Sequence, residues 1–210
     1  LVDKEYILFT DSVDGKIYNL DRKSGKVDVF RDSLLQPTGI GWSEKSGLIW
    51  VVETGRHRLI ALDKIGKMVS STGRRGKEPG MFNYPNFMHI DNSGVLYIVD
   101  SMNFRIQMFD ETGHLMGVFG EAGNHTGYLA RPKGLTVDEA GNKYICDALL
   151  NTVQVFDFHG RYLYRFGGPG KNPGEFMIPV GICLNKDRIY VADRLNQRIQ
   201  EFKLTGIDEH

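Results

Sequence analysis

At four corresponding turns of the 210-residue sequence, an acidic residue stands five positions before a basic residue. The pairs are Asp11 with Lys16, Glu53 with Arg58, Asp100 with Arg105, and Asp193 with Arg198. Two side chains at this spacing lie close together when the chain turns back between them, so each pair can form an ion pair. The same carboxylates could instead form a ring of catalytic acids around an axis. Because a catalytic site does not need a copy in every repeat, we interpret the pairs as structural and identify no catalytic residue.

A fifth acidic residue, Asp147, departs from this pattern. Thr152 stands at the position where the other acids have a basic partner, and Cys146 precedes the acid. A departure from a repeat can mark a specialised function, although simple sequence drift explains it more readily.

Patterns typical of metal and cofactor sites are absent from the sequence. The six His residues show no HxH or HExxH spacing, and no nucleophile elbow, phosphate-binding loop or dinucleotide fingerprint occurs. The two cysteines, Cys146 and Cys183, form no CxxC pair, and whether they pair with each other stays open. His89 is expected on an inner strand, where a lone His is usually a core residue. We therefore predict no metal and no cofactor.

The residues that could do chemistry are carried by an internal repeat. Four prolines, Pro37, Pro85, Pro132 and Pro179, open similar segments at intervals of 48, 47 and 47 residues. A fixed period of this length predicts a repeat architecture. Within each unit, short runs of β-branched and aromatic residues alternate with turns rich in Asp, Asn and Gly, a pattern that favours strands.

The third unit shows the expected strands: 87–90, 96–99, 105–109 and 115–119. A four-stranded antiparallel unit buries both faces only when it is stacked on neighbours, so we predict an all-β fold, a single β-propeller domain. The predicted blades are 1–36 (partial), 37–84, 85–131, 132–178 and 179–210 (partial). This amounts to about 4.5 blades. The second and third strands would be duplicated if the two partial blades merged, so we expect the 210 residues to belong to a longer chain.

The repeat resembles the NHL family. The segment Pro173-Gly174-Glu175-Phe176 with Ile189-Tyr190-Val191-Ala192-Asp193 and Asn196-Gln197-Arg198-Ile199-Gln200 carries the likeness, and the unit from Pro85 to Gly120 repeats it. The resemblance implies a propeller that closes with six blades, and it covers protein-binding, RNA-binding, sensor and enzymatic members. The compact spacing is similar to that of bacterial members, many of them exported. This implies an extracytoplasmic site, periplasmic or secreted, and a place in a cell-envelope or redox complex.

The turns between the second and third strands, and the long connections between blades, share one face of a propeller. We predict that this face binds a protein partner, because apolar side chains occupy turns that ought to be wet. The candidate residues are Arg56, His57, Arg74, Arg75, Tyr84, Met102, Phe104, Leu149 and Leu150.

Two other functions stay open. An RNA-binding surface could form from Arg56, Arg58, Arg74, Arg75 and Lys77, but 26 basic residues balance 26 acidic ones and argue against nucleic acid as the main partner. A metal-dependent lactonase or lyase is the enzymatic alternative.

For the enzymatic alternative, the resemblance to a propeller lyase would place zinc histidines where this sequence has Thr38, Asn86, Lys133 and Val180, which counts against zinc. A lactonase-type calcium site would draw on Glu53, Asn103, Asn151 and Asp193. No apolar run of about 20 residues predicts a transmembrane span.

Overall fold

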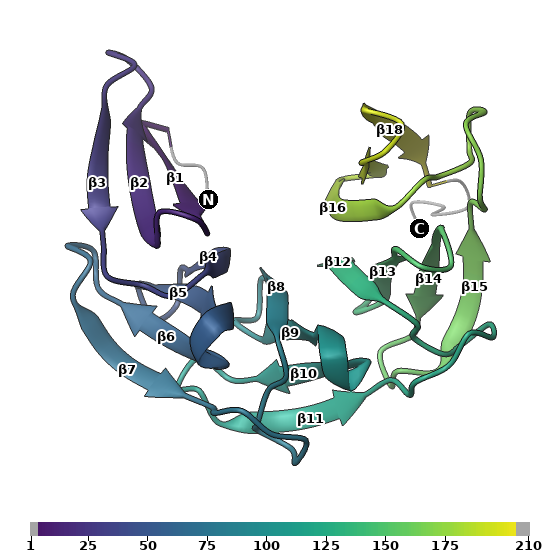
Figure 1. The fold of residues 1–210 in the computed structure, drawn as a ribbon, viewed down its shortest axis with the longest axis horizontal. Coiled ribbons are helices and arrows are strands. Elements are labelled where there is room, and N and C mark those ends of the chain that lie inside the picture. The colour runs from purple at the N-terminus through teal and green to yellow at the C-terminus, as the bar shows by residue number, and fades with distance from the viewer. Residues whose placement is uncertain (1–3, 205–210) are drawn as a thin grey trace. The chain divides into compact units, whose positions relative to one another are not determined.

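The computed structural model describes residues 4–204, and this part of the chain divides into two compact units, which are treated separately below. Unit 1 comprises residues 1–118 and unit 2 comprises residues 119–210. Both consist of antiparallel meander sheets (Figure 1).

Unit 1 contains three blades. The first has the strands β1 (Tyr6–Asp11), β2 (Lys16–Asp21) and β3 (Val27–Arg31). The second has β4 (Pro37–Ser43), β5 (Leu48–Glu53), β6 (Arg58–Leu62) and β7 (Met68–Thr72). The third has β8 (Pro85–Ile90), β9 (Leu96–Asp100), β10 (Arg105–Phe109) and β11 (Leu115–Phe119).

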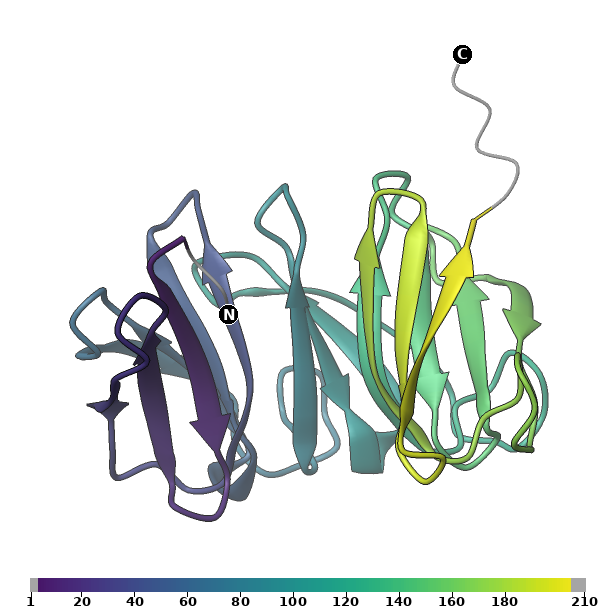
Figure 2. The ribbon, with the colours of Figure 1, turned by 90° about the horizontal axis from the view of Figure 1, so that it is seen from above.

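Unit 2 contains two blades. The fourth blade has β12 (Pro132–Val137), β13 (Lys143–Asp147), β14 (Thr152–Phe156) and β15 (Tyr162–Phe166). The fifth has β16 (Pro179–Asn185), β17 (Arg188–Asp193) and β18 (Arg198–Lys203). Figure 2 shows the strands of a blade running alongside one another in opposite directions. The predicted all-β propeller architecture is therefore confirmed, and four blades begin at the prolines that mark the repeat.

Turn chemistry explains why the strands end where they do. Between β8 and β9, Asp91 Oδ1 accepts hydrogen bonds from the backbone N–H groups of Ser93 and Val95, at 2.9 and 3.0 Å. Gly94 occupies the left-handed region at φ 90°, which a glycine adopts at no steric cost. An Asx turn of this kind reverses the chain within four residues, which is why the strand boundaries of this blade follow the sequence pattern so closely.

Neighbouring blades within each unit pack through their first strands. In unit 1, β4 packs against β8, and the core between the second and third blades includes Trp50, Phe82 and Phe109, all about 1% exposed or less. In unit 2, β12 packs against β16, and a Cβ on Gly134 would lie only 2.9 Å from the Cα of Gly181. The absence of side chains here lets the two backbones approach closely.

Two single-turn 3-10 helices, which the sequence did not predict, fill the turns after β5 and β9: η1 (Thr54–Arg56) and η2 (Ser101–Asn103). Each ends at a residue in the left-handed conformation, His57 at φ 52° and Phe104 at φ 55°. Neither helix has the length needed to cross a membrane, and no other helix in residues 4–204 has it either.

Candidate binding surface

The buried acid at the end of β9 organises the loops around it. Asp100 is 0% exposed, and its Oδ2 accepts hydrogen bonds from Arg105 Nε at 2.8 Å and Asn103 Nδ2 at 2.8 Å. Gln107 Nε2 donates to the same oxygen at 3.0 Å, while the backbone N–H of Asn83 donates to Oδ1 at 2.6 Å. A buried carboxylate is tolerated when a charge and several donors compensate its lost hydration, and all of these are present here.

Two other blades carry the same ion pair. Glu53 Oε2 lies 2.6 Å from Arg58 Nε, and Asp193 Oδ2 lies 2.8 Å from Arg198 Nε. With Asp100 and Arg105, three of the four pairs expected from the sequence are present in the structure.

The fourth expected pair, Asp11 with Lys16, does not form. Lys16 Nζ lies 3.5 Å from Asp14 Oδ2 instead, and Asp11 Oδ1 accepts the backbone N–H groups of Val13 and Asp14, both at 2.9 Å. Arginine can reach its partner through Nε while its outer nitrogens bond elsewhere, whereas lysine has only a terminal ammonium. In this partly exposed turn the lysine pairs with the acid inside the turn.

Asp147 lacks a basic partner, as its sequence position implied, but it is not unsatisfied. Its carboxylate accepts four backbone N–H groups at 2.7 to 3.1 Å, from Ala130, Arg131, Leu149 and Leu150. Backbone donors therefore replace the arginine of the other blades, and the residue has a structural role like theirs.

The same network fixes the long connection between β7 and β8. Arg105 Nη2 donates to the carbonyl oxygens of Glu78 and Met81, both at 2.9 Å. Gln107 Nε2 also donates to Met81 O, at 2.7 Å, and its Oε1 accepts the N–H of Gly80 at 2.8 Å. In unit 2, Arg198 and Gln200 hold the connection between β15 and β16 in the same way. These connections are clamped, so side chains on them are presented in fixed positions.

A histidine and a tyrosine form the best-defined contact on this surface in unit 1. The backbone N–H of Tyr84 donates to His57 Nδ1 at 3.1 Å, and the rings meet edge-on with centroids 4.7 Å apart. His57, expected on the surface, is only 7% exposed because Tyr84, itself 45% exposed, covers it. Burial, and then the charge of Arg75, lower the pKa of His57 below its usual 6.5. The imidazole is therefore neutral at pH 7, with Nδ1 as the acceptor.

Apolar side chains flank a shallow cavity beside this contact. Met102 is 52% exposed on η2, and Phe104 is partly exposed at the end of the helix. With Lys77, Asn103 and Arg105 they line a cavity of about 260 Å³. The wall of this cavity is rigid, because Arg105 and Asn103 belong to the network around Asp100.

The basic cluster of the second blade is smaller than the sequence indicates. Arg56 and Arg58 both bond to Glu53, so one carboxylate compensates one of their two charges. Arg74, Arg75 and Lys77 are exposed on the clamped connection. Of these three cations, Lys77 lines the cavity, and the charge of Arg75 acts on His57.

The two remaining candidates belong to unit 2. Leu149 is 60% exposed, and Leu150 is partly exposed. Their backbone N–H groups bond to Asp147, so this turn is also rigid. The candidate residues thus form two separate groups, one in each unit.

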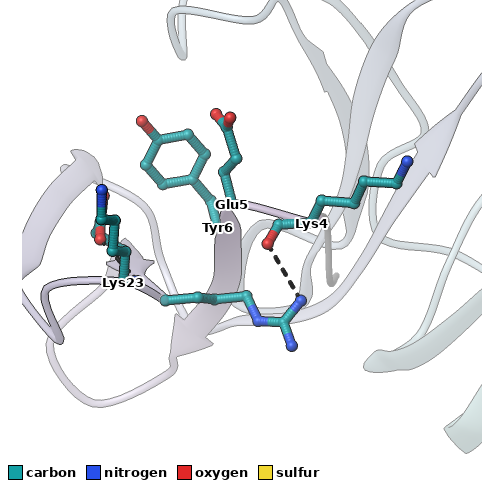
Figure 3. Close-up of a pocket in the computed structure, with 6 residues that line it drawn as sticks. Lys4, Glu5, Tyr6 and Lys23 are labelled. Carbon is teal, nitrogen blue, oxygen red and sulfur yellow. Dashed lines mark hydrogen bonds between the residues drawn. The ribbon is translucent and has the colours of Figure 1, made fainter.

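A second cavity, of about 430 Å³, was not expected from the sequence. Lys4, Glu5, Tyr6, Asp21, Arg22 and Lys23 line it, at the edge of the first blade (Figure 3). Arg22 Nη1 donates to Lys4 O at 3.3 Å across it. Its side chains are of mixed charge and mostly exposed, and no sequence pattern distinguishes them from an ordinary turn.

Both cysteines are free thiols in the structure. Cys146 is fully buried, which raises its thiol pKa, while Cys183 is exposed. Among residues 4–204, no group of three or more His, Cys, Asp or Glu side chains is arranged to hold a metal ion.

The residues proposed for a calcium site are engaged in the blade framework. Both oxygens of Glu53 accept hydrogen bonds, from Leu35 N–H and from two arginines, and both oxygens of Asp193 do likewise. Asn151 Oδ1 accepts the N–H of Ile178 at 2.8 Å. These groups do not fit a calcium site, because their lone pairs already serve the fold.

Two family profiles match different parts of the chain. Residues 4–117, more than half of the chain, match the profile of the SMP-30/gluconolactonase/LRE-like region. Residues 131–209 match a profile described as a 6-bladed beta-propeller. No curated protein matches the sequence.

Solved structures with the same fold include two lyases. A streptogramin B lyase has a TM-score of 0.70 at 21% identity, over 98% of this chain and 68% of that chain. The virginiamycin B lyase of Staphylococcus aureus has a TM-score of 0.65 at 19% identity, over 96% and 67%. A chain of the nidogen/laminin complex has a TM-score of 0.72 at 17% identity, over 95% and 72%. At these identities the likeness shows the fold alone.

Proposed function

The chain belongs to the SMP-30/gluconolactonase/LRE-like family, and we propose that it is a non-enzymatic binding module that engages a protein partner through the loop surface of unit 1. The surface consists of Tyr84, Met102 and Phe104 with the cations Arg74, Arg75 and Lys77. The observation that carries the proposal is that exposed apolar side chains stand on clamped backbone. The NHL type of the repeat and an extracytoplasmic location stay predictions.

This surface is suited to binding because its side chains are held in place before a partner arrives. A side chain that is already fixed loses little conformational entropy when a partner covers it. Aromatic and methionine side chains are enriched at the centres of protein interfaces, and a basic rim steers an acidic partner toward them. The expected partner is therefore a protein with an apolar side chain that enters the 260 Å³ cavity, flanked by acidic residues. The neighbour from the nidogen/laminin complex lends general support, since that structure contains two proteins bound together.

The test compares two apolar-to-charged substitutions in unit 1. We expect Phe104→Asp to abolish capture of the partner from native extract by the immobilised chain. Met116→Asp, on β11, changes a side chain that is 60% exposed but distant in sequence from the surface, and it should leave capture unchanged. Leu149→Asp asks the same question of unit 2. If Phe104→Asp folds and captures the same proteins as the unmodified chain, the surface is not the binding site.

An enzymatic function is the second candidate, favoured by the family and by the two lyase structures. The engaged carboxylates described above count against a calcium-dependent lactonase built on them. Metal analysis of the purified chain, together with assays on lactones and on a streptogramin B antibiotic, tests it. Stoichiometric calcium or zinc with turnover would replace the binding proposal.

A further inference from the structure

Three basic residues of unit 2 gather at one end of its two first strands. Arg131 immediately precedes β12, Lys133 is the second residue of β12, and Arg194 immediately follows β17. The position of Lys133 corresponds to Thr38 in β4, since both follow the proline that begins the strand.

Backbone contacts bring the three residues together. β12 packs against β16, where Gly134 and Gly181 meet. The N–H of Arg194 lies 3.4 Å from the carbonyl oxygen of Ile178, which directly precedes β16. Arg131 is held at the start of β12, because its N–H donates to Asp147 and its carbonyl accepts from Ala148. The ends of the two adjacent strands therefore carry all three cations.

Among residues 4–204, no carboxylate forms a salt bridge with this cluster. The salt bridges of unit 2 within the described residues use Arg161, Arg188, Arg198 and Lys203. Two acids lie near the cluster in the fold, Asp147 and Asp193, and both are buried. Asp147 accepts backbone N–H groups, including that of Arg131, and Asp193 bonds to Arg198 and to the N–H of Met177, so neither forms a salt bridge with a side chain of the cluster.

The surroundings of Lys133 disfavour the charged form of its side chain. Its side chain is half-buried, and its pKa is lowered by burial first and then by the charges of Arg131 and Arg194. Three positive charges that repel one another, one of them partly desolvated, form a site that an anion would stabilise.

We propose that Arg131, Lys133 and Arg194 form a binding site for the phosphate group of a small molecule. Guanidinium groups present paired donors that match phosphate oxygens, and the ammonium supplies a point charge. A divalent phosphate compensates three cations better than a single carboxylate does. The site belongs to unit 2 and is independent of the protein-binding surface proposed for unit 1.

The test is a titration of the full chain with inorganic phosphate at constant ionic strength, followed by backbone and lysine side-chain NMR. We expect saturable shifts at Lys133, Arg131 and Arg194, and an upward shift of the Lys133 pKa. Acetate at the same concentration should bind at least tenfold more weakly, a difference of about 1.4 kcal/mol. The absence of saturable shifts at these residues would overturn the proposal.

Matched variants separate a site from general electrostatics. Lys133→Thr and Arg194→Ser introduce residues found at the corresponding places in other blades, Thr38 and Ser12, so we expect both to fold. Each should weaken phosphate binding about tenfold or more. Lys171→Thr removes the same charge from an exposed loop of unit 2 and should change the affinity for phosphate less than twofold. If Lys171→Thr weakens binding as much as Lys133→Thr, no dedicated site exists.

A vesicle-binding experiment distinguishes the phosphate group of a lipid headgroup from that of a small molecule. Phosphatidylcholine vesicles with and without phosphatidate should retain the chain equally. Retention that depends on phosphatidate and is lost in Lys133→Thr would assign the residues to a lipid surface and overturn the small-molecule proposal.

Discussion

The residue that follows the buried acid distinguishes the two units. In unit 1, Ser12 Oγ donates to Pro37 O at 2.7 Å and Thr54 Oγ1 donates to Pro85 O at 2.5 Å, so a hydroxyl links each of these blades to the next. In unit 2 the corresponding residues are Ala148 and Arg194, which have no hydroxyl. A buried acid whose arginine and glutamine neighbours clamp the preceding connection occurs in both units: Asp100 with Arg105 and Gln107, and Asp193 with Arg198 and Gln200. The hydrogen bonds around the acid therefore maintain the fold, while the residue that follows the acid can vary and can carry a charge.

The largest effect is expected from breaking the clamp itself. Asp100→Ala removes the acceptor of Arg105, Asn103 and Gln107 and leaves a largely buried guanidinium without its partner. We expect a loss of about 3 kcal/mol in the free energy of unfolding of unit 1. Urea denaturation followed by tryptophan fluorescence measures it, because Trp42 and Trp50 both lie in unit 1.

The matched change in unit 2 is Asp147→Ala, which leaves backbone N–H groups without an acceptor but strands no charge. We expect it to lower the free energy of unfolding of unit 2 by roughly 2 kcal/mol, less than the change in unit 1. Hydrogen exchange of the amides of β13 measures this loss. Equal losses in the two units would show that the arginine contributes nothing beyond the backbone donors.

A smaller effect is expected from exchanging the hydroxyls. Thr54→Ala should destabilise unit 1 by about 1 to 2 kcal/mol, because Pro85 O loses its buried donor. The reverse change, Ala148→Ser, offers Pro179 O a donor and should stabilise unit 2 by up to about 1 kcal/mol. Denaturation curves of the two variants test both signs. Destabilisation by Ala148→Ser would mean that the blades of unit 2 meet in a different geometry.

The smallest effect concerns pH. The pKa of His57 is lowered in the folded chain, so the unfolded chain takes up the proton first as the pH falls below about 6.5, and the stability of unit 1 decreases there. His57→Asn introduces the residue that unit 2 has at Asn151, whose side chain also accepts a backbone N–H. Between pH 7.5 and 5 the variant should lose less stability than the unmodified chain. Parallel pH curves would contradict the assignment of a neutral, buried imidazole.

The sequence predicts the strands well because local chemistry sets their ends. In the third blade the observed β10 and β11 have the predicted bounds, 105–109 and 115–119, and the Asx turn of Asp110 with Gly113 fixes the reversal between them. Spacing also predicts which acids face arginines across a turn. It does not predict that Lys16 bonds to Asp14, because that choice depends on side-chain reach within the turn.

The surface was harder to predict than the strands. His57 is covered by Tyr84, a residue 27 positions away, and this contact depends on left-handed backbone at both positions. The gathering of Arg131, Lys133 and Arg194 likewise requires two blades to pack in register. No periodicity within one repeat carries that information.

The clamp also bears on how the chain folds. The hydrogen bonds that Arg105 and Gln107 make to the preceding connection span 24 to 27 residues, less than one repeat. Loop-closure entropy rises only slowly with loop length, so closing loops of this length costs little more than closing shorter ones. Each connection can therefore be captured by its own blade before the neighbouring blades dock. We therefore expect a loop and the strands that follow it to fold as one kinetic unit, rather than the blade that begins at each proline.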